Sequence, residues 1–256
     1  MALASGDYHC IAFDLPGIGH STLEVPCGRK KFLAELMWEA IEQLGLRDVI
    51  LVGHDVGGMI AYACLRQKPE HLRAAIIMNT VIPGVDPWDA VESNPYVWHF
   101  AFHSLPDLPE LLVAPNPGVY FDYFYDVISG DEATVPVASR SRYVESYRSP
   151  GSLQQGFEFY RSFRDDELDN RQKRPTVETP VLYMRGEQEG GDIDDYMKGL
   201  WSVGFNHLEG RVVEKAGHFC PDEQPGRAWQ LISDFILERA PMKGSAQIST
   251  TDEAKK

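Results

Sequence analysis

Short apolar runs alternate with amphipathic stretches along most of the chain. In residues 30–44 the apolar side chains recur at three- and four-residue steps, which is the spacing of a helix with one buried face. Continuous apolar runs are instead typical of strands that are covered on both faces of a parallel sheet. Such runs occupy residues 8–14, 49–52, 74–78, 181–184 and 211–214, and further helices are expected at residues 59–68 and 225–238. The alternation predicts an α/β fold with a doubly wound, mostly parallel sheet.

The pattern changes between residues 83 and 175. Aromatic residues and prolines become frequent there, helical spacing dominates, and no run has the character of a buried strand. We therefore predict a sheet domain formed by residues 1–82 and 176–240, with residues 83–175 inserted as a helical cap. Residues 241–256 are polar and are expected to be disordered.

Composition narrows the partners that such a fold can have. The 256 residues carry a formal charge of −14, which would repel nucleic acid and anionic membranes, so we expect neither as a partner. No apolar run reaches the roughly 20 residues of a membrane-spanning helix. The four cysteines are scattered without the spacing of a zinc site, and we expect free thiols. No signal peptide is found in the first residues; the localisation stays open, with the cytoplasm expected if the N-terminus is genuine.

The most informative segment, GHDVGG at residues 53–58, follows an expected strand and leads into an expected helix. Small residues two positions before and after a polar residue are what a nucleophile elbow needs. Here Gly53 and Gly57 would let the backbone turn tightly beneath the exposed side chain of Asp55. A carboxylate can attack a saturated carbon and leave an ester, which water then hydrolyses. The plain alternative is that Asp55 only caps the helix that follows.

A histidine occupies the corresponding place after the last expected strand. His218 lies in AGHF at residues 216–219, on a short loop before the final helix, so it should face the same edge of the sheet as Asp55. An imidazole there can activate the water that opens an ester. A solvated loop histidine is the alternative, and His54 is expected to support the elbow from beneath.

These segments resemble the α/β-hydrolase family, and within it the epoxide hydrolases and haloalkane dehalogenases that use an aspartate nucleophile. The resemblance runs from about residue 8 to residue 238. It rests most firmly on DLPGIGHS at residues 14–21, on the GHDVGG elbow and on AGHF. In the cap, WHFAFH, LPDLPE and GFEFYR, which begin at residues 98, 105 and 156, are similar to the epoxide hydrolase branch.

That branch holds the epoxide oxygen with a cap histidine and a cap tyrosine. Carried over position by position, the resemblance makes His99 and Tyr160 the ring-opening pair, with His103 as the next candidate. An imidazole or a phenol can donate the hydrogen bond that the opening epoxide oxygen needs. From spacing alone, Tyr160 is equally well explained as a packed aromatic residue, and His99 is similarly ambiguous.

The resemblance also implies an acid that orients His218, placed after one of two strands. At the first place this chain has the neutral Asn79, and at the second Glu189 matches the family position, with Asp192 in reserve. The alternative for both carboxylates is a solvated acidic loop. The implied chemistry requires no metal or organic cofactor.

The chain departs from the family before residue 8. Family members have further strands there, and the following loop carries a His-Gly-x-Pro stretch that helps to form the oxyanion hole; this sequence has none. We expect either that the sheet rearranges to bring residues 8–14 beside residues 49–52, or that the sequence is an N-terminally shortened version of a longer protein. The Val56 N–H remains as an oxyanion donor. Because one lost donor typically costs about 10²–10³ in rate, we expect the chain as written to be poorly active and poorly stable.

The leading hypothesis is a hydrolase that opens a small, apolar epoxide to a vicinal diol through an ester on Asp55. A haloalkane dehalogenase would use the same nucleophile and base, but Val56 and Met59 provide no halide-binding group. A non-catalytic ligand-binding member of the fold is the alternative from a different class, and Asn79 and the lost oxyanion segment favour it. The physiological substrate and the oligomeric state, a homodimer included, are left open.

Overall fold

The computed structural model describes residues 8–131 and 134–241. Its strands form one parallel sheet in the order β1-β2-β3-β4. They span Val49–His54 (β1), Leu72–Met78 (β2), Val181–Gly186 (β3) and Leu208–Val213 (β4). The predicted α/β fold is therefore confirmed, and each expected strand after residue 48 is present.

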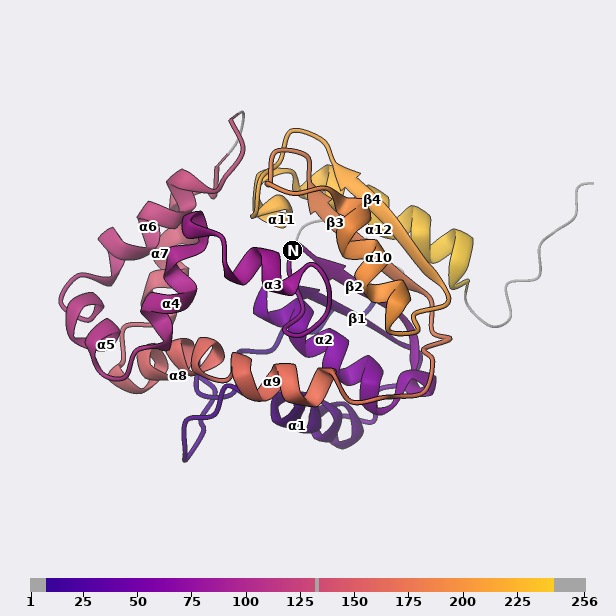
Figure 1. Ribbon diagram of the computed structural model, residues 1–256, viewed down its shortest axis with the longest axis horizontal. Helices are drawn as coiled ribbons and strands as arrows, with labels where there is room; N and C mark the ends of the chain where they lie inside the picture. Colours follow the sequence, from indigo (N-terminus) through magenta and orange to yellow (C-terminus); the bar gives the residue numbers. More distant parts are fainter. Residues whose placement is uncertain (1–7, 132–133, 242–256) are drawn as a thin grey trace, which may run out of the picture.

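Helices cover both faces of the sheet (Figure 1). On one face, Ala75 and Ile77 of β2 pack in a core shared with α1 (Lys30–Gln43), α2 (Val56–Gln67) and α10 (Ile193–Ser202). On the other face, Ile76 of β2 packs against α12 (Pro225–Arg239). Successive side chains of a strand point to opposite faces, so a continuous apolar run supplies both cores. This arrangement makes the fold doubly wound.

The expected strand at residues 8–14 was wrong. The segment has no regular structure, and the side chains of Ile11 and Phe13 are each 39% exposed. Within the described chain β1 pairs only with β2, so residues 8–14 do not join the ladder and the expected rearrangement is not found. An extended segment without a neighbouring strand has no partners for its ladder hydrogen bonds, and so it does not form a strand.

The segment between β2 and β3 is helical, as expected, and the described part of residues 83–175 contains no strand. Figure 1 shows most of it as a group of helices beside the sheet domain, with α8 and α9 leading back beneath it. The helices are α3 (Trp88–Glu92), α4 (Trp98–Ser104), α5 (Leu108–Val113), α6 (Pro117–Val127), α7 (Val137–Ser146), α8 (Pro150–Arg161) and α9 (Phe163–Asn170). The boundaries of the two parts remain a prediction, and residues 242–256 of the expected tail lie outside the described residues.

No helix in the described ranges has the length and apolar character needed to cross a membrane. The four cysteines are free thiols, with Cys64 and Cys220 buried, as the scattered spacing predicted.

Candidate active site

The elbow forms where β1 ends and α2 begins. Asp55 lies between them with φ 52° and ψ −123°, a left-handed conformation that is rare for a residue with a side chain. Its side chain makes no capping hydrogen bond to α2, which argues against the helix-cap alternative. Because Val56 is the first residue of α2, its N–H has no partner within the helix and can face the elbow.

The glycines of the elbow have different roles from those expected. A Cβ at Gly53 would lie 2.1 Å from the carbonyl oxygen of Gly57, so only glycine fits there. The expectation for Gly57 was wrong, because a Cβ at that position meets nothing within 4 Å. The second crowded position is Gly58, where a Cβ would lie 2.7 Å from Cγ2 of Thr80. The turn therefore depends on the close approach of Gly53 to α2.

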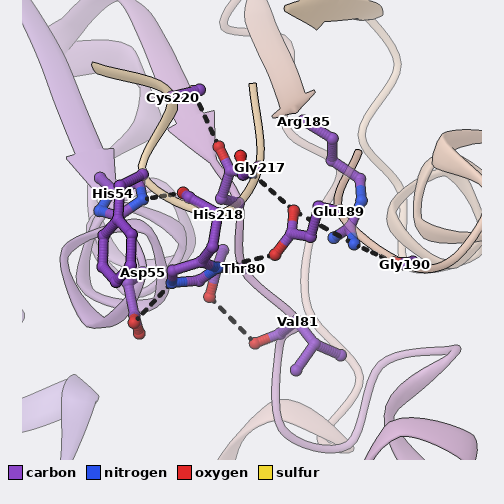
Figure 2. A network of polar contacts seen from close by, with 12 residues as sticks. His54, Asp55, Thr80, Val81, Arg185, Glu189, Gly190, Gly217, His218 and Cys220 are labelled. Carbon is purple, nitrogen blue, oxygen red and sulfur yellow. Dashed lines mark hydrogen bonds and ion pairs between the residues drawn. The ribbon is translucent and has the colours of Figure 1, made fainter. Parts of the chain in front are cut away.

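Three of the candidate residues meet at the carboxyl edge of the sheet (Figure 2). Nε2 of His218 lies 3.1 Å from Oδ2 of Asp55, and Nδ1 of His218 lies 2.7 Å from Oε1 of Glu189. Asp55 comes from the end of β1, Glu189 from the loop after β3 and His218 from the loop after β4. Since parallel strands point their carboxyl ends to one edge, residues far apart in the chain form a continuous nucleophile, base and acid arrangement.

The charges of these three groups are strongly coupled. Burial alone would lower the pKa of His218, but hydrogen bonds and charge from Asp55 and Glu189 raise it to about 10. Partial burial tends to raise the pKa of Asp55, but the hydrogen bond and charge of His218 outweigh this effect and lower the pKa to about 2. For Glu189, burial also raises the pKa, and His218 and Arg185 outweigh that effect and hold it below its usual value. The resting site is an imidazolium between two carboxylates.

Glu189 is held on its second oxygen as well. Asn79 donates its side-chain amide to Oε2 of Glu189 at 2.6 Å, and Nη2 of Arg185 lies 3.2 Å from the same oxygen. Cys220 donates its thiol to Oδ1 of Asn79 at 2.9 Å. Asn79 thus lies at the first of the two places where the family can have the acid. Here its side chain instead hydrogen-bonds to Glu189, which is the acid at the second place.

The reserve acid does not reach the site. Asp192 is exposed and caps α10, where its side chain accepts a hydrogen bond from the N–H of Asp194 at 3.0 Å. Glu189, and not Asp192, is therefore the carboxylate that contacts Nδ1 of His218.

The His218 loop is clamped by groups that the sequence analysis did not single out. The Glu223 carboxylate accepts hydrogen bonds from the N–H groups of Gly217 and Phe219, both at 2.8 Å, and from Gly130 of the cap at 2.7 Å. His54 contributes from the elbow, since its Nε2 lies 2.7 Å from the carbonyl oxygen of His218. His54 therefore supports the histidine loop rather than only the elbow.

His99 on α4 and Tyr160 on α8 lie together in the cap. Their ring centroids are 6.0 Å apart, and no hydrogen bond within the described chain uses the His99 ring nitrogens or the Tyr160 hydroxyl. Burial lowers the pKa of His99 to about 4 and raises that of Tyr160, so both groups are neutral hydrogen-bond donors near pH 7. His103 is 5% exposed, and its Nε2 lies 2.5 Å from the Tyr120 hydroxyl. His103 is thus already paired, whereas His99 is not.

The described residues hold no group of three or more His, Cys, Asp or Glu side chains that could bind a metal ion.

Of the site residues that the sequence analysis missed, Arg185 had a visible signal: it is a charged residue that directly continues the apolar run at residues 181–184. Glu223 had none, because nothing in the linear pattern marks its carboxylate as the acceptor for the N–H groups of Gly217, Phe219 and Gly130.

The fold, the elbow and the three-residue edge site define a class of protein, and comparison with known families agrees. The profile of the alpha/beta hydrolase fold family matches residues 1–225, so the chain belongs to the α/β-hydrolase family. It is similar to a soluble epoxide hydrolase of Corynebacterium sp. (strain C12), with 27% identity over 89% of this chain and 79% of the relative. Human epoxide hydrolase 4 is 23% identical over 93% of this chain and 67% of its own length.

Solved structures show the same fold. The structure of wild-type Cfl2 from Burkholderia cenocepacia superposes with a TM-score of 0.76 at 28% identity, covering 86% of this chain and 76% of that one. The epoxide hydrolase CorEH superposes with a TM-score of 0.74 over 88% of this chain and 80% of its own, and its 24% identity supports the fold alone. The chain is thus an α/β hydrolase related to epoxide hydrolases at low identity.

Proposed function

We propose that this α/β hydrolase opens a small, apolar epoxide to a vicinal diol through an ester on Asp55. The observation that carries the proposal is a carboxylate, in place of a hydroxyl or thiol, at the elbow and 3.1 Å from a histidine. A carboxylate nucleophile suits attack on a saturated carbon, and 41% of the Asp55 side chain is exposed and so accessible to a substrate.

In the first step, Asp55 attacks one epoxide carbon and the bond between that carbon and the ring oxygen breaks. The electron pair of that bond passes to the oxygen, which needs a proton or strong hydrogen bonds. His99 and Tyr160 would supply them, because both side chains are neutral and neither makes a side-chain hydrogen bond within the described chain. The oxygen takes a proton from one of these two donors, which regains a proton from solvent, and the product is a hydroxyalkyl ester on Asp55.

In the second step, His218 takes a proton from water and the hydroxide adds to the ester carbonyl of Asp55. The Val56 N–H, at the first position of α2, would bind the resulting oxyanion. Collapse of that intermediate breaks the ester bond, the departing alkoxide takes the remaining proton of the added water to complete the diol, and Asp55 returns as a carboxylate. Glu189 holds the His218 ring in the orientation that this step needs.

The test is a trapping experiment with a panel of aliphatic and aromatic epoxides. His218→Gln should form the ester but hydrolyse it slowly, so the peptide that contains Asp55 should gain the mass of one epoxide. The same peptide of the Asp55→Ala variant should gain none. Normal turnover by Asp55→Ala would refute the mechanism, and binding without product in the unmodified chain would favour the ligand-binding alternative.

The dehalogenase alternative needs its own measurement. Halide release from a panel of chloroalkanes separates the two reactions, since both would use Asp55 and His218. We expect no release, because Val56 and Met59 offer no group that binds a halide ion. Release at a rate similar to that of epoxide opening would replace the proposed substrate class.

A further inference from the structure

Arg185 is a buried cation behind the acid of the site. Its side chain is 5% exposed, Nη2 lies 3.2 Å from Oε2 of Glu189, and Nη2 donates to the carbonyl oxygen of Gly190 at 2.6 Å. The guanidinium lies over the Tyr196 ring, 3.9 Å from its centroid. In Figure 2, Arg185 and His218 reach the Glu189 carboxylate from different sides. The two cationic groups thus share one anion.

We propose that Arg185 is a positioning residue whose charge balances Glu189, so that His218 is a neutral base once Asp55 has become an ester. The proposal rests on the function proposed above and adds to it a second requirement of the hydrolytic step. That step needs a free imidazole nitrogen to accept a proton from water, so His218 has to lose its proton near neutral pH.

The net charge around His218 changes when the ester forms, and Arg185 determines what remains. In the resting site His218 faces two carboxylates and is cationic. Ester formation removes the charge of Asp55 and leaves Glu189 as the anion in contact with the ring. With Arg185 beside it, Glu189 is already neutralised, and a proton on His218 would add an uncompensated buried charge. Without Arg185, the same proton would pair with Glu189 and be retained.

A guanidinium is suited to this role because it stays protonated throughout the accessible pH range. The other titratable groups around His218 contribute little net positive charge. Burial lowers the pKa of His54 and His99 and raises that of Cys220 and Tyr183, so each of these four groups is neutral. Among the described residues, the charged groups on neighbouring segments are held elsewhere: Glu223 binds the backbone N–H groups of the His218 loop, Asp222 accepts a hydrogen bond from the Tyr143 hydroxyl, and Lys30 is paired with Asp166. Lys215, on the same loop as His218, is exposed.

The experiment measures the His218 pKa directly by following its imidazole resonances by NMR as a function of pH. An Asp55→Asn background provides a neutral side chain in place of the ester, so the measurement needs no substrate. Adding Arg185→Met should raise the His218 pKa by about one pH unit or more, since removal of a nearby charge typically shifts a pKa by that amount. The methionine keeps an apolar chain over Tyr196, and Arg185→Gln, which keeps a donor for Gly190, is the second neutral variant.

Two matched controls separate charge from packing. Arg185→Lys in the same background retains the charge and should leave the His218 pKa close to that of Asp55→Asn alone. Arg66 lies near the C-terminal end of α2 and makes comparable contacts: its guanidinium lies 4.6 Å from the centroid of the Phe205 ring and donates to the carbonyl oxygen of Val203. Arg66→Gln removes this charge far from the elbow. It should leave the His218 pKa unchanged. An unchanged His218 pKa in a folded Arg185→Met or Arg185→Gln variant would overturn the proposal.

A kinetic readout connects the titration to the reaction. In an otherwise unmodified chain, Arg185→Met should shift the rise of ester hydrolysis to higher pH while ester formation keeps its pH dependence. If the His218 pKa moves as expected but no epoxide reacts with any variant, the proposed function fails and the charge balance stands. If epoxides react but the His218 pKa does not move, the role of Arg185 fails alone.

Discussion

Lys30 and Asp166 form a buried ion pair between the sheet domain and the cap. Nζ of Lys30 lies 3.0 Å from Oδ2 of Asp166, and the two side chains are only 4% and 2% exposed. The Lys30 backbone N–H also donates to Oδ1 of Asp166 at 2.8 Å, and its ammonium contacts the carbonyl oxygen of Phe159. One residue of α1 is thus bound to the segment formed by α8 and α9. The pair fixes the position of these cap helices against the sheet domain.

Removing one partner of this pair should strongly destabilise the chain. Lys30→Met leaves the Asp166 carboxylate buried without its cation, and breaking a buried pair in this way typically costs about 3–5 kcal/mol. The free energy of unfolding, measured by urea denaturation, should fall by that amount. The double variant Lys30→Met/Asp166→Leu should recover most of the loss, because it leaves no unpaired charge. An exposed pair supplies the control: Lys198→Met removes a partner of Asp195, with side chains 67% and 57% exposed, and should change stability little.

The elbow glycines predict opposite effects of the same substitution. Gly53→Ala should severely destabilise the chain, because its methyl group would lie 2.1 Å from the carbonyl oxygen of Gly57. Gly57→Ala should stabilise it by about 0.5–1 kcal/mol, since the position is open and lies in α2, where alanine is the better helix former. Thermal unfolding of the two variants would show the contrast. Equal effects of both substitutions would contradict the close contact at Gly53.

The strands after residue 48 could be predicted from the sequence, because each corresponds to a continuous apolar run flanked by turn residues. The run at residues 74–78 is the clearest example, because β2 is buried on both faces of the sheet and leaves no room for polar side chains. The site was partly readable for the same reason. Parallel strands bring their ends to one edge, so loop residues after β1, β3 and β4 could be expected to meet.

The rest depends on contacts between distant segments. Residues 8–14 have the composition of a strand, but a strand needs a neighbour, and none pairs with them among the described residues. Lys30 looks like a solvated residue at the start of an amphipathic helix, yet α9 covers it. Arg185 and Asn79 meet on one carboxylate although more than a hundred positions separate them in sequence. Such pairings follow from packing, which a linear pattern does not encode.

Substitutions of the two candidate acids, Glu189 and Asp192, should affect the hydrolytic step differently. Glu189→Gln should slow ester hydrolysis on the order of 10⁴-fold, the loss seen when an orienting acid becomes an amide in a triad. Asp192→Asn should leave it unchanged, because Asp192 caps α10 and does not contact His218. Single-turnover kinetics with an epoxide would separate ester formation from its hydrolysis. Equal rates for Glu189→Gln and the unmodified chain would assign the orienting role elsewhere.

Stability should depend on pH through His218. Its pKa is raised to about 10 in the folded chain, compared with about 6.5 for an unfolded histidine. The folded state therefore binds the proton more tightly, and its stabilisation is complete below about pH 6.5 and lost as the pH rises through about 10. Urea denaturation at several pH values should show the unmodified chain losing its advantage over His218→Gln across this window. A constant difference between the two chains would contradict the raised pKa.

The cap pair is expected to act on the first step only. Tyr160→Phe and His99→Phe each remove one hydrogen bond to the opening epoxide oxygen, so each should slow ester formation by about 10²–10³-fold, as the loss of one oxyanion donor does. Hydrolysis of an ester already formed should proceed normally, because it depends on His218 and Glu189. Tyr143→Phe is the matched control, since that cap tyrosine is exposed and hydrogen-bonds to Asp222. Its rate of ester formation should match that of the unmodified chain. Burst-phase mass spectrometry of the Asp55 peptide measures the ester directly, and an undiminished burst in both Tyr160→Phe and His99→Phe would exclude them as the ring-opening pair.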